Sequence, residues 1–161
     1  MKKALLLALA LIAVGCGPDR PEGRDMAELA RKFVPTTLVN RDGKELSASQ
    51  YLDIETFEPY TGPIVRYDTK WCDGEGVVEF TGYLKNGFHH GKGYYYSCAG
   101  ELTTEWTYFE GVEHGPYESY EIDGFDRQKG SYDMGDLCGD WVRLGQYESH
   151  PPCPLFTEGG N

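Results

Sequence analysis

Glycines that recur at a fixed spacing constrain this 161-residue chain more than any other feature. One column, with a period of 24 residues, contains Gly87, Gly111 and Gly135, and a second column contains Gly91, Gly115 and Gly139. Large side chains keep the same period in the columns Tyr96, Tyr120, Leu144 and Leu84, Tyr108, Tyr132. A fixed period of this length indicates an array of similar structural units that pack against one another.

Each unit is predicted to be a β-hairpin. About six residues rich in Tyr, Val, Thr and Trp are followed by a turn with glycine, a second such run and another turn. Because one hairpin buries too little apolar surface to fold alone, we expect neighbouring hairpins to pair edge to edge in an elongated sheet, with tyrosine columns along one face. The unit that begins at Gly62 is 29 residues long, and we place its five extra residues in the turn around residues 71–76. The predicted fold class is therefore all-β.

The N-terminus has the features of a bacterial export signal. Two lysines precede an uncharged apolar run over residues 4–14, which is too short to span a hydrocarbon core that needs about 20 residues. The run ends in Ala13-Val14-Gly15-Cys16, which resembles the lipobox of bacterial lipoproteins. The resemblance implies cleavage after residue 15 and an acylated Cys16 that anchors the protein in the cell envelope, in the outer membrane if the host has two membranes. The alternative is an ordinary signal peptide with an incidental cysteine.

The charge balance argues against two classes of partner. Removal of residues 1–15 takes away Lys2 and Lys3 and leaves 13 basic and 26 acidic residues, a net charge of −13. Sequence-independent binding of nucleic acid and adhesion to anionic lipid headgroups both require a basic surface, so neither is expected. Hydrophobic residues make up 40% of the chain and aromatic residues 14%, which favours a folded domain over a disordered acidic segment. The oligomeric state stays open.

We divide the chain into five segments: a signal peptide (1–15), a Pro- and Gly-containing tether (16–23), an N-terminal cap helix with a lead-in strand (24–59), hairpin repeats (60–148) and a C-terminal tail (149–161). The helix is predicted over residues 25–33 and ends before Pro35, because Met26, Leu29, Ala30 and Phe33 have helical spacing. We expect this helix and the tail to cover the two open ends of the sheet.

The repeats resemble those of the MORN-repeat family, in the variant found in bacterial YwqK-type antitoxins. The resemblance spans roughly residues 36–148 and rests on Tyr60-Thr61-Gly62-Pro63, Leu84-Lys85-Asn86-Gly87 with Gly91, Tyr108-Phe109-Glu110-Gly111 with Gly115, and Tyr132-Asp133-Met134-Gly135 with Gly139. It implies the hairpin sheet described above. The name of the family also implies an alternative function, an antitoxin or immunity-type inhibitor that binds a toxin; export argues against a cytosolic toxin.

Four cysteines remain beyond Cys16. An even number in an exported protein favours two disulfides, and four cysteines allow three pairings. The absence of a Cys-x-x-Cys pair argues against a zinc site and against a thioredoxin-like redox motif. In the repeat alignment, the first two cysteines occupy comparable turns of adjacent units, and the third is in reach of the tail. We therefore expect the pairs Cys72–Cys98 and Cys138–Cys153.

No sequence motif indicates catalytic activity or a cofactor-binding site. The chain contains no nucleophile elbow, His-Glu-x-x-His, P-loop or EF-hand string, and its two Gly-x-Gly sequences are interpreted as turns. Two clusters suggest a metal: His90 and His114 share a column, and a weak calcium site would draw on Glu110, Glu113, Asp133, Asp136 and Asp140. We favour solvated turn residues in both cases and expect no metal, no cofactor and no catalysis.

The aromatic residues are the remaining candidates for function. Successive strand residues point to opposite faces, so Tyr94, Tyr95 and Tyr96 cannot all be buried on one side. Exposed aromatic patches are where protein partners bind, and the candidates for this face are Tyr95, Trp106, Tyr117 and Trp141. The sequence thus predicts a membrane-anchored, non-enzymatic interaction or scaffold module of the cell envelope, with an envelope protein or a glycan as its partner.

Overall fold

The computed structural model describes residues 21–68, 70, 72, 76–120 and 127–156. The predictions for the signal peptide, for Cys16 and for most of the tether lie outside these residues. The described residues contain no helix of the length and apolarity that crossing a membrane requires.

The described chain is built from β-strands and one turn of 3-10 helix, η1 (Met26–Glu28), so the predicted all-β class is confirmed. The strands are β1 (Arg24–Asp25), β2 (Leu29–Val39), β3 (Glu45–Asp53), β4 (Gly62–Tyr67), β5 (Val78–Lys85), β6 (Phe88–His89), β7 (Gly91–Tyr96), β8 (Leu102–Phe109), β9 (Val112–Glu113), β10 (Gly115–Ser119), β11 (Gln128–Asp133), β12 (Asp136–Arg143) and β13 (Gln146–Ser149).

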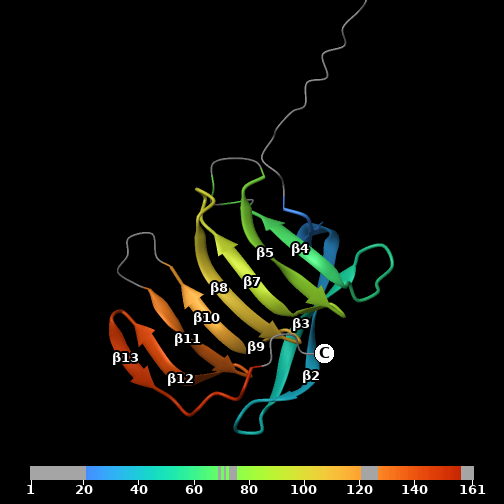
Figure 1. Ribbon diagram of the computed structural model, residues 1–161. Helices are drawn as coiled ribbons and strands as arrows, with labels where there is room; N and C mark the ends of the chain where they lie inside the picture. The colour runs from blue at the N-terminus through green and yellow to red at the C-terminus, as the bar shows by residue number, and fades with distance from the viewer. Residues whose placement is uncertain (1–20, 69, 71, 73–75, 121–126, 157–161) are drawn as a thin grey trace, which may run out of the picture.

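Consecutive strands lie side by side in one large curved sheet (Figure 1). Its order is β1-β4-β5-β7-β8-β10-β11-β12-β13, with β6 and β9 as short additions to β5 and β8. All pairs are antiparallel except β1 with β4. The second sheet is the hairpin β2–β3.

The predicted helix over residues 25–33 is wrong. Beyond the single turn η1, the chain continues as β2, which pairs antiparallel with β3 from Leu29 opposite Asp53 to Val39 opposite Glu45. Leu29 is buried, as the helical pattern required, but the Phe33 side chain is 75% exposed. Pro35 and its β-branched neighbours disfavour helix, and β3 supplies a partner for the backbone hydrogen bonds. The open edge of β4 is covered by β1 instead of a helix.

The hairpin β2–β3 lies across the tight turns at one rim of the large sheet, beneath β5 and β9 in Figure 1. The Tyr51 amide donates to the Gly87 carbonyl (2.8 Å), and Gln50 Nε2 donates to the Asn86 carbonyl (3.2 Å). At the hairpin's tip, the Arg41 amide donates to Asp136 (3.2 Å). Because these turns repeat every 24 residues, one straight hairpin contacts them in succession.

Gly87 is required both by its backbone and by its neighbour. Its φ of +81° lies in the left-handed region, and a Cβ there would sit 2.6 Å from the Tyr51 carbonyl oxygen. Gly43, at the tip of β2–β3, has a similar φ of +77° but open space around it. We expect Gly43→Ala to cost about 1 kcal/mol from backbone strain alone, and Gly87→Ala to cost a further 1–3 kcal/mol, roughly, from overlap. Urea unfolding of both variants measures the difference, and equal losses would contradict this packing.

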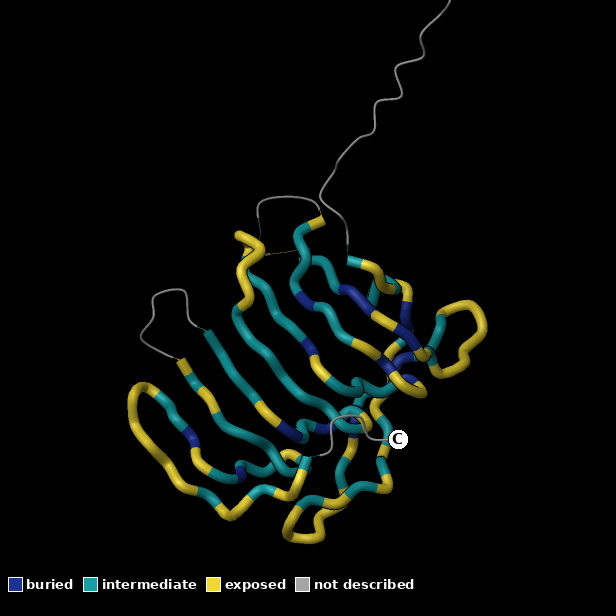
Figure 2. The backbone as a smooth tube through the Cα atoms, in the orientation of Figure 1, coloured by how far each residue is buried: buried dark blue, intermediate teal, exposed yellow. Residues whose placement is uncertain are grey.

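The core lies between the large sheet and β3, where Leu29, Tyr51, Ile64, Phe80 and Leu84 form one buried cluster. Figure 2 shows buried positions along β4 and β5, and further ones on later strands of the large sheet. The Phe80 ring lies against Gly82 and Gly93, where a Cβ would come within 2.8 Å of its atoms. A Cβ at Gly130 would likewise overlap the Trp141 ring. Because they have no side chain, these glycines leave room for large aromatic rings.

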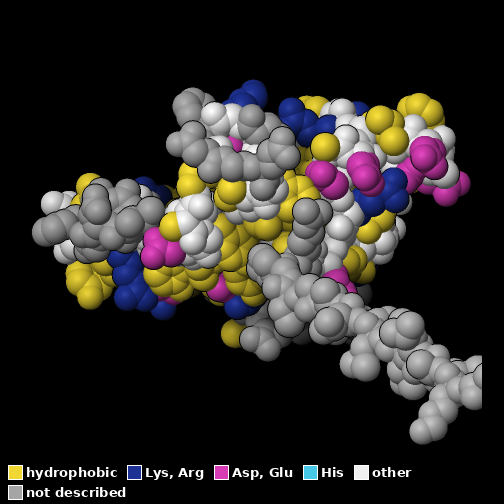
Figure 3. All heavy atoms as spheres, turned by 90° about the horizontal axis from the view of Figure 1, so that it is seen from above, with side chains coloured by type: hydrophobic (Ala, Val, Ile, Leu, Met, Phe, Trp, Pro, Cys, Tyr) yellow, Lys and Arg dark blue, Asp and Glu magenta, His cyan; other side chains and the backbone are white. Residues whose placement is uncertain are grey.

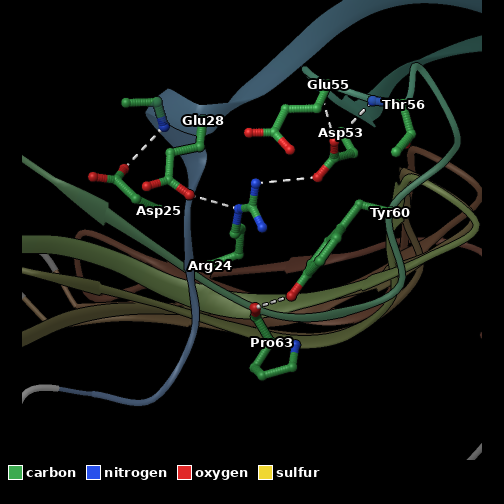
Figure 4. Close-up of polar contacts among 9 residues, drawn as sticks. Arg24, Asp25, Glu28, Asp53, Glu55, Thr56, Tyr60 and Pro63 are labelled. Atoms are coloured by element: carbon green, nitrogen blue, oxygen red, sulfur yellow. Dashed lines mark hydrogen bonds and ion pairs between the residues drawn. The ribbon is translucent and has the colours of Figure 1, made fainter.

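A polar network holds η1 against the loop after β3 (Figure 4). Arg24 contacts Glu28 (2.6 Å) and Asp53 (3.1 Å). Asp53 also accepts hydrogen bonds from the amides of Thr56 and Glu55, and these bonds, with the Arg24 charge, lower the pKa of its carboxyl. The carboxylates of this network are thus occupied in fixing the N-terminal segment.

Both predicted cysteine pairs are present in the structure, Cys72–Cys98 and Cys138–Cys153. The described part of the tail, up to Phe156, does not cover the open edge of the sheet, contrary to expectation. That edge is β13, whose residues are all exposed, and the chain after it continues beside β12, where the His150 amide donates to the Gly139 carbonyl (2.9 Å). The tail then reaches His114, whose ring centroid is 5.0 Å from that of Phe156. The disulfide to buried Cys138 explains this path.

Candidate binding face

One face of the large sheet carries a continuous run of aromatic rings, which we call the aromatic strip. The strand register sets it, because residues directly opposite each other share a face: Phe80 faces Tyr95, Gly93 faces Trp106, and Tyr117 faces Gly130. The members of the strip are Phe80, Tyr95, Trp106, Tyr108, Tyr117, Tyr132 and Trp141. They come from six strands, β5, β7, β8, β10, β11 and β12.

The rings of the strip contact one another from strand to strand. Centroid distances are 4.7 Å for Phe80–Tyr95, 4.5 Å for Trp106–Tyr117, 5.6 Å for Trp106–Tyr132 and 5.1 Å for Tyr132–Trp141. Several pairs meet edge to face, as at Trp106–Tyr117 (65°) and Tyr132–Trp141 (79°). The rings of these pairs are therefore not coplanar, and Figure 3 shows hydrophobic side chains gathered in the middle of one side of the molecule.

The structure places the four candidate residues together on this strip but buries them to different depths. Tyr95, Trp106 and Tyr117 are partly exposed. Trp141 is 0% exposed, so its interpretation as a surface residue is wrong; it is a core side chain whose Nε1 donates to the Ser131 carbonyl (3.1 Å). Trp141 can be buried because Gly130 has no side chain and leaves room for its ring. No sequence pattern indicates that these two residues are in contact.

The predicted alternation of Tyr94, Tyr95 and Tyr96 is confirmed. Tyr95 lies on the strip opposite Phe80, whereas Tyr94 lies opposite Thr81, on the other face. The Tyr96 hydroxyl is 3.3 Å from Thr81 Oγ1 on that second face. The second face also carries ion pairs such as Lys92–Glu105 (2.6 Å) and Lys129–Glu118 (3.4 Å), so it is the more polar of the two.

A repeat column runs beside the strip and contains His89, Glu113 and Leu137. The His89 ring packs on Tyr108 at 5.2 Å, and burial together with the Arg66 charge lowers its pKa to about 4, so this histidine is neutral at pH 7. Glu113, opposite Tyr108 in the register, occupies the next position of the column. Burial raises the pKa of its carboxyl, and none of the described residues gives this carboxyl a hydrogen bond or an ion pair.

Two arginines lie at opposite ends of the strip. The Arg66 guanidinium lies 5.6 Å from the centroid of Phe80 and 5.7 Å from that of Tyr95, and it donates two hydrogen bonds to Glu79 (2.8 and 3.0 Å). Arg143 stacks on Trp141 at 4.6 Å. Its buried Nε has no hydrogen-bond partner, and in the described part of the chain its guanidinium forms no ion pair.

The two metal hypotheses are not favoured by the geometry. His90 and His114 pack near the same ring, with centroids 5.6 and 6.0 Å from Phe109. His114 Nδ1 accepts from the Met134 amide (3.3 Å), while Asp133 bonds Arg41. No group of three or more His, Cys, Asp or Glu side chains within the described residues is arranged to hold a metal ion.

Sequence reasoning missed Glu113 and Arg143 as neighbours of the aromatic candidates. From the sequence, Glu113 is expected to be a solvated turn residue. The signal for its position beside the strip was the column itself, since Glu113 follows His89 by one period and precedes Leu137 by another.

Comparison with protein-family models, with curated proteins and with solved structures found no match.

Proposed function

We propose that this chain is an exported, lipid-anchored protein of the cell envelope that works as a non-enzymatic interaction module and binds a protein partner on the aromatic strip. The observation that carries the proposal is the strip itself, in which Tyr95, Trp106 and Tyr117 are partly exposed on one face. In the described chain, the main contacts of β10, β11 and β12 are with neighbouring strands of their own sheet. Tyr and Trp are enriched among the few residues that supply most of the binding free energy of a protein interface.

The export half of the proposal rests on the N-terminal pattern and on the cysteines. Disulfides persist in oxidising compartments, and both cysteine pairs lie within bonding distance here. The MORN-like assignment draws support from the sheet, in which the turns at Gly87, Gly111 and Gly135 all have positive φ and lie along one rim. The edge-to-face packing of the rings favours protein side chains as ligands over a sugar ring, which would stack on a flat aromatic surface.

The test is site-specific photocrosslinking in the producing cell. p-Azidophenylalanine replaces either Tyr117, on the strip, or Tyr94, on the opposite face of the sheet, because this residue differs little from tyrosine in size. We expect a defined crosslinked protein from position 117 and not from position 94, and we expect Cys16→Ser to release the protein from the membrane fraction. A glycan-binding module would instead yield no protein adduct. Equal crosslinking from both faces would contradict the assignment of the strip.

A further inference from the structure

Glu113 places a carboxyl group where the other units of the repeat have an uncharged side chain. The equivalent positions are His89, which is neutral at pH 7, and Leu137. His89 packs on Tyr108, and the residue one period after Tyr108 is Tyr132, so Glu113 stands beside Tyr132 as His89 stands beside Tyr108. Burial raises the pKa values of both tyrosines, and the charge of Glu113 adds to the rise, which agrees with this position.

Nothing in the described structure compensates this carboxylate. Burial is the cause that raises its pKa, and neither Arg143, which acts on Tyr132, nor any other cation lowers it. A half-buried carboxylate without a hydrogen bond or counter-ion reduces stability. Groups retained at such a cost within a partly exposed surface are candidates for contact with a ligand.

We propose that the aromatic strip, if it is the partner-binding face proposed above, receives an arginine or lysine side chain of the partner protein, with the cation beside the Glu113 carboxylate. The partner's aliphatic stem lies along the rings of Trp106 and Tyr132, whose centroids are 5.6 Å apart. Aromatic rings attract cations, and a carboxylate in a half-buried site makes a strong charge-assisted hydrogen bond. The net charge of −11 attracts basic partners from a distance.

The cation is tested with two acetylated tripeptide amides, Gly-Arg-Gly and Gly-citrulline-Gly, because citrulline has nearly the shape of arginine and no charge. NMR chemical shifts of the indole N–H of Trp106, which is partly exposed on the strip, report binding. We expect the arginine peptide to bind at least about tenfold more tightly than the citrulline peptide, with the larger shifts at Trp106. Equal affinities would overturn the inference.

Glu113→Gln removes the charge and keeps the shape. We expect this variant to bind both peptides equally, whereas the matched control Glu110→Gln, an exposed acid on the turn of the same hairpin, keeps the preference for arginine. Folding raises the pKa of the Glu113 carboxyl, so the folded state favours its protonated form. The free energy of unfolding is therefore higher at low pH and falls as the pH rises through the folded-state pKa. The glutamine variant avoids that loss and is expected to be at least as stable at pH 7.

The partner crosslinked at position 117 separates this inference from the proposed function. If Glu113→Gln releases that partner, both stand. If the partner remains equally bound, the module function stands and the cation site is refuted. If no partner is crosslinked but the arginine peptide binds in a Glu113-dependent way, the cation site stands and the protein-binding function is refuted.

Discussion

Trp141→Ala is expected to lower the free energy of unfolding by about 3–5 kcal/mol, the range for removing a fully buried tryptophan. Its side chain is 0% exposed and fills the space over Gly130, between Tyr117 and Tyr132, whose ring centroids are 5.6 and 5.1 Å away. The truncation leaves a cavity beneath the C-terminal half of the aromatic strip. It also removes the donor to the Ser131 carbonyl. Urea unfolding followed by circular dichroism measures the loss.

The matched control for Trp141 is Tyr147→Ala. Tyr147 is an aromatic residue on the adjacent strand β13, but its side chain is 84% exposed. We expect this variant to change stability by no more than about 0.5 kcal/mol. A loss below about 1 kcal/mol for Trp141→Ala, or losses of similar size in the two variants, would show that Trp141 is not the core residue described here.

Removal of either disulfide, as Cys72→Ala with Cys98→Ala or as Cys138→Ala with Cys153→Ala, is expected to cost about 3–4 kcal/mol. The two bridges close loops with sequence separations of 26 and 15 residues, and the longer loop restricts the unfolded chain more. The first pair is therefore expected to show the larger loss, by roughly 0.5 kcal/mol. Urea midpoints of the two double variants and of the wild type give the comparison.

The two bridges differ in their local effects. Cys138–Cys153 is the covalent link that holds the tail beside β12, so its loss is expected to speed amide hydrogen exchange at His150, whose amide donates to Gly139. The Cys72–Cys98 variant serves as the control, because it should leave that amide protected. A reducing agent should shift the midpoint of the wild type toward those of the variants. An unchanged midpoint in fully reduced wild type would contradict the predicted contribution.

Much of the fold follows from local chemistry and could be predicted for that reason. The glycine columns mark tight turns because left-handed backbone is a property of single residues, and Gly87, Gly111 and Gly135 all adopt it. Turns at regular intervals between β-rich runs lead to a sheet of consecutive strands. The cysteine pairs followed from the same alignment, since it places Cys72 and Cys98 in turns of adjacent units.

The path of residues 25–53 and the depth of Trp141 depended on contacts between distant parts of the chain. The spacing of Met26, Leu29, Ala30 and Phe33 fits a helix, but this segment pairs with β3 instead. The resulting hairpin packs against the turns at Gly87 and Gly111. A short helical segment has little intrinsic stability compared with the free energy gained from this strand pairing and packing. Trp141 is buried because Gly130, on the neighbouring strand, leaves room for its ring.

The sequence by itself determined the turns of the large sheet, the strands between them and the alternation that brings aromatic residues to one face, because these depend on each residue and its near neighbours. Only the tertiary structure decided which of those rings are accessible to solvent and that the Glu113 carboxylate lies beside them. Burial is a property of the whole surface that closes over a side chain, so Trp141 and Tyr117 look alike in the sequence and differ in the fold. For the same reason, Glu113 is an ordinary surface acid in the sequence and a half-buried, uncompensated carboxylate in the structure.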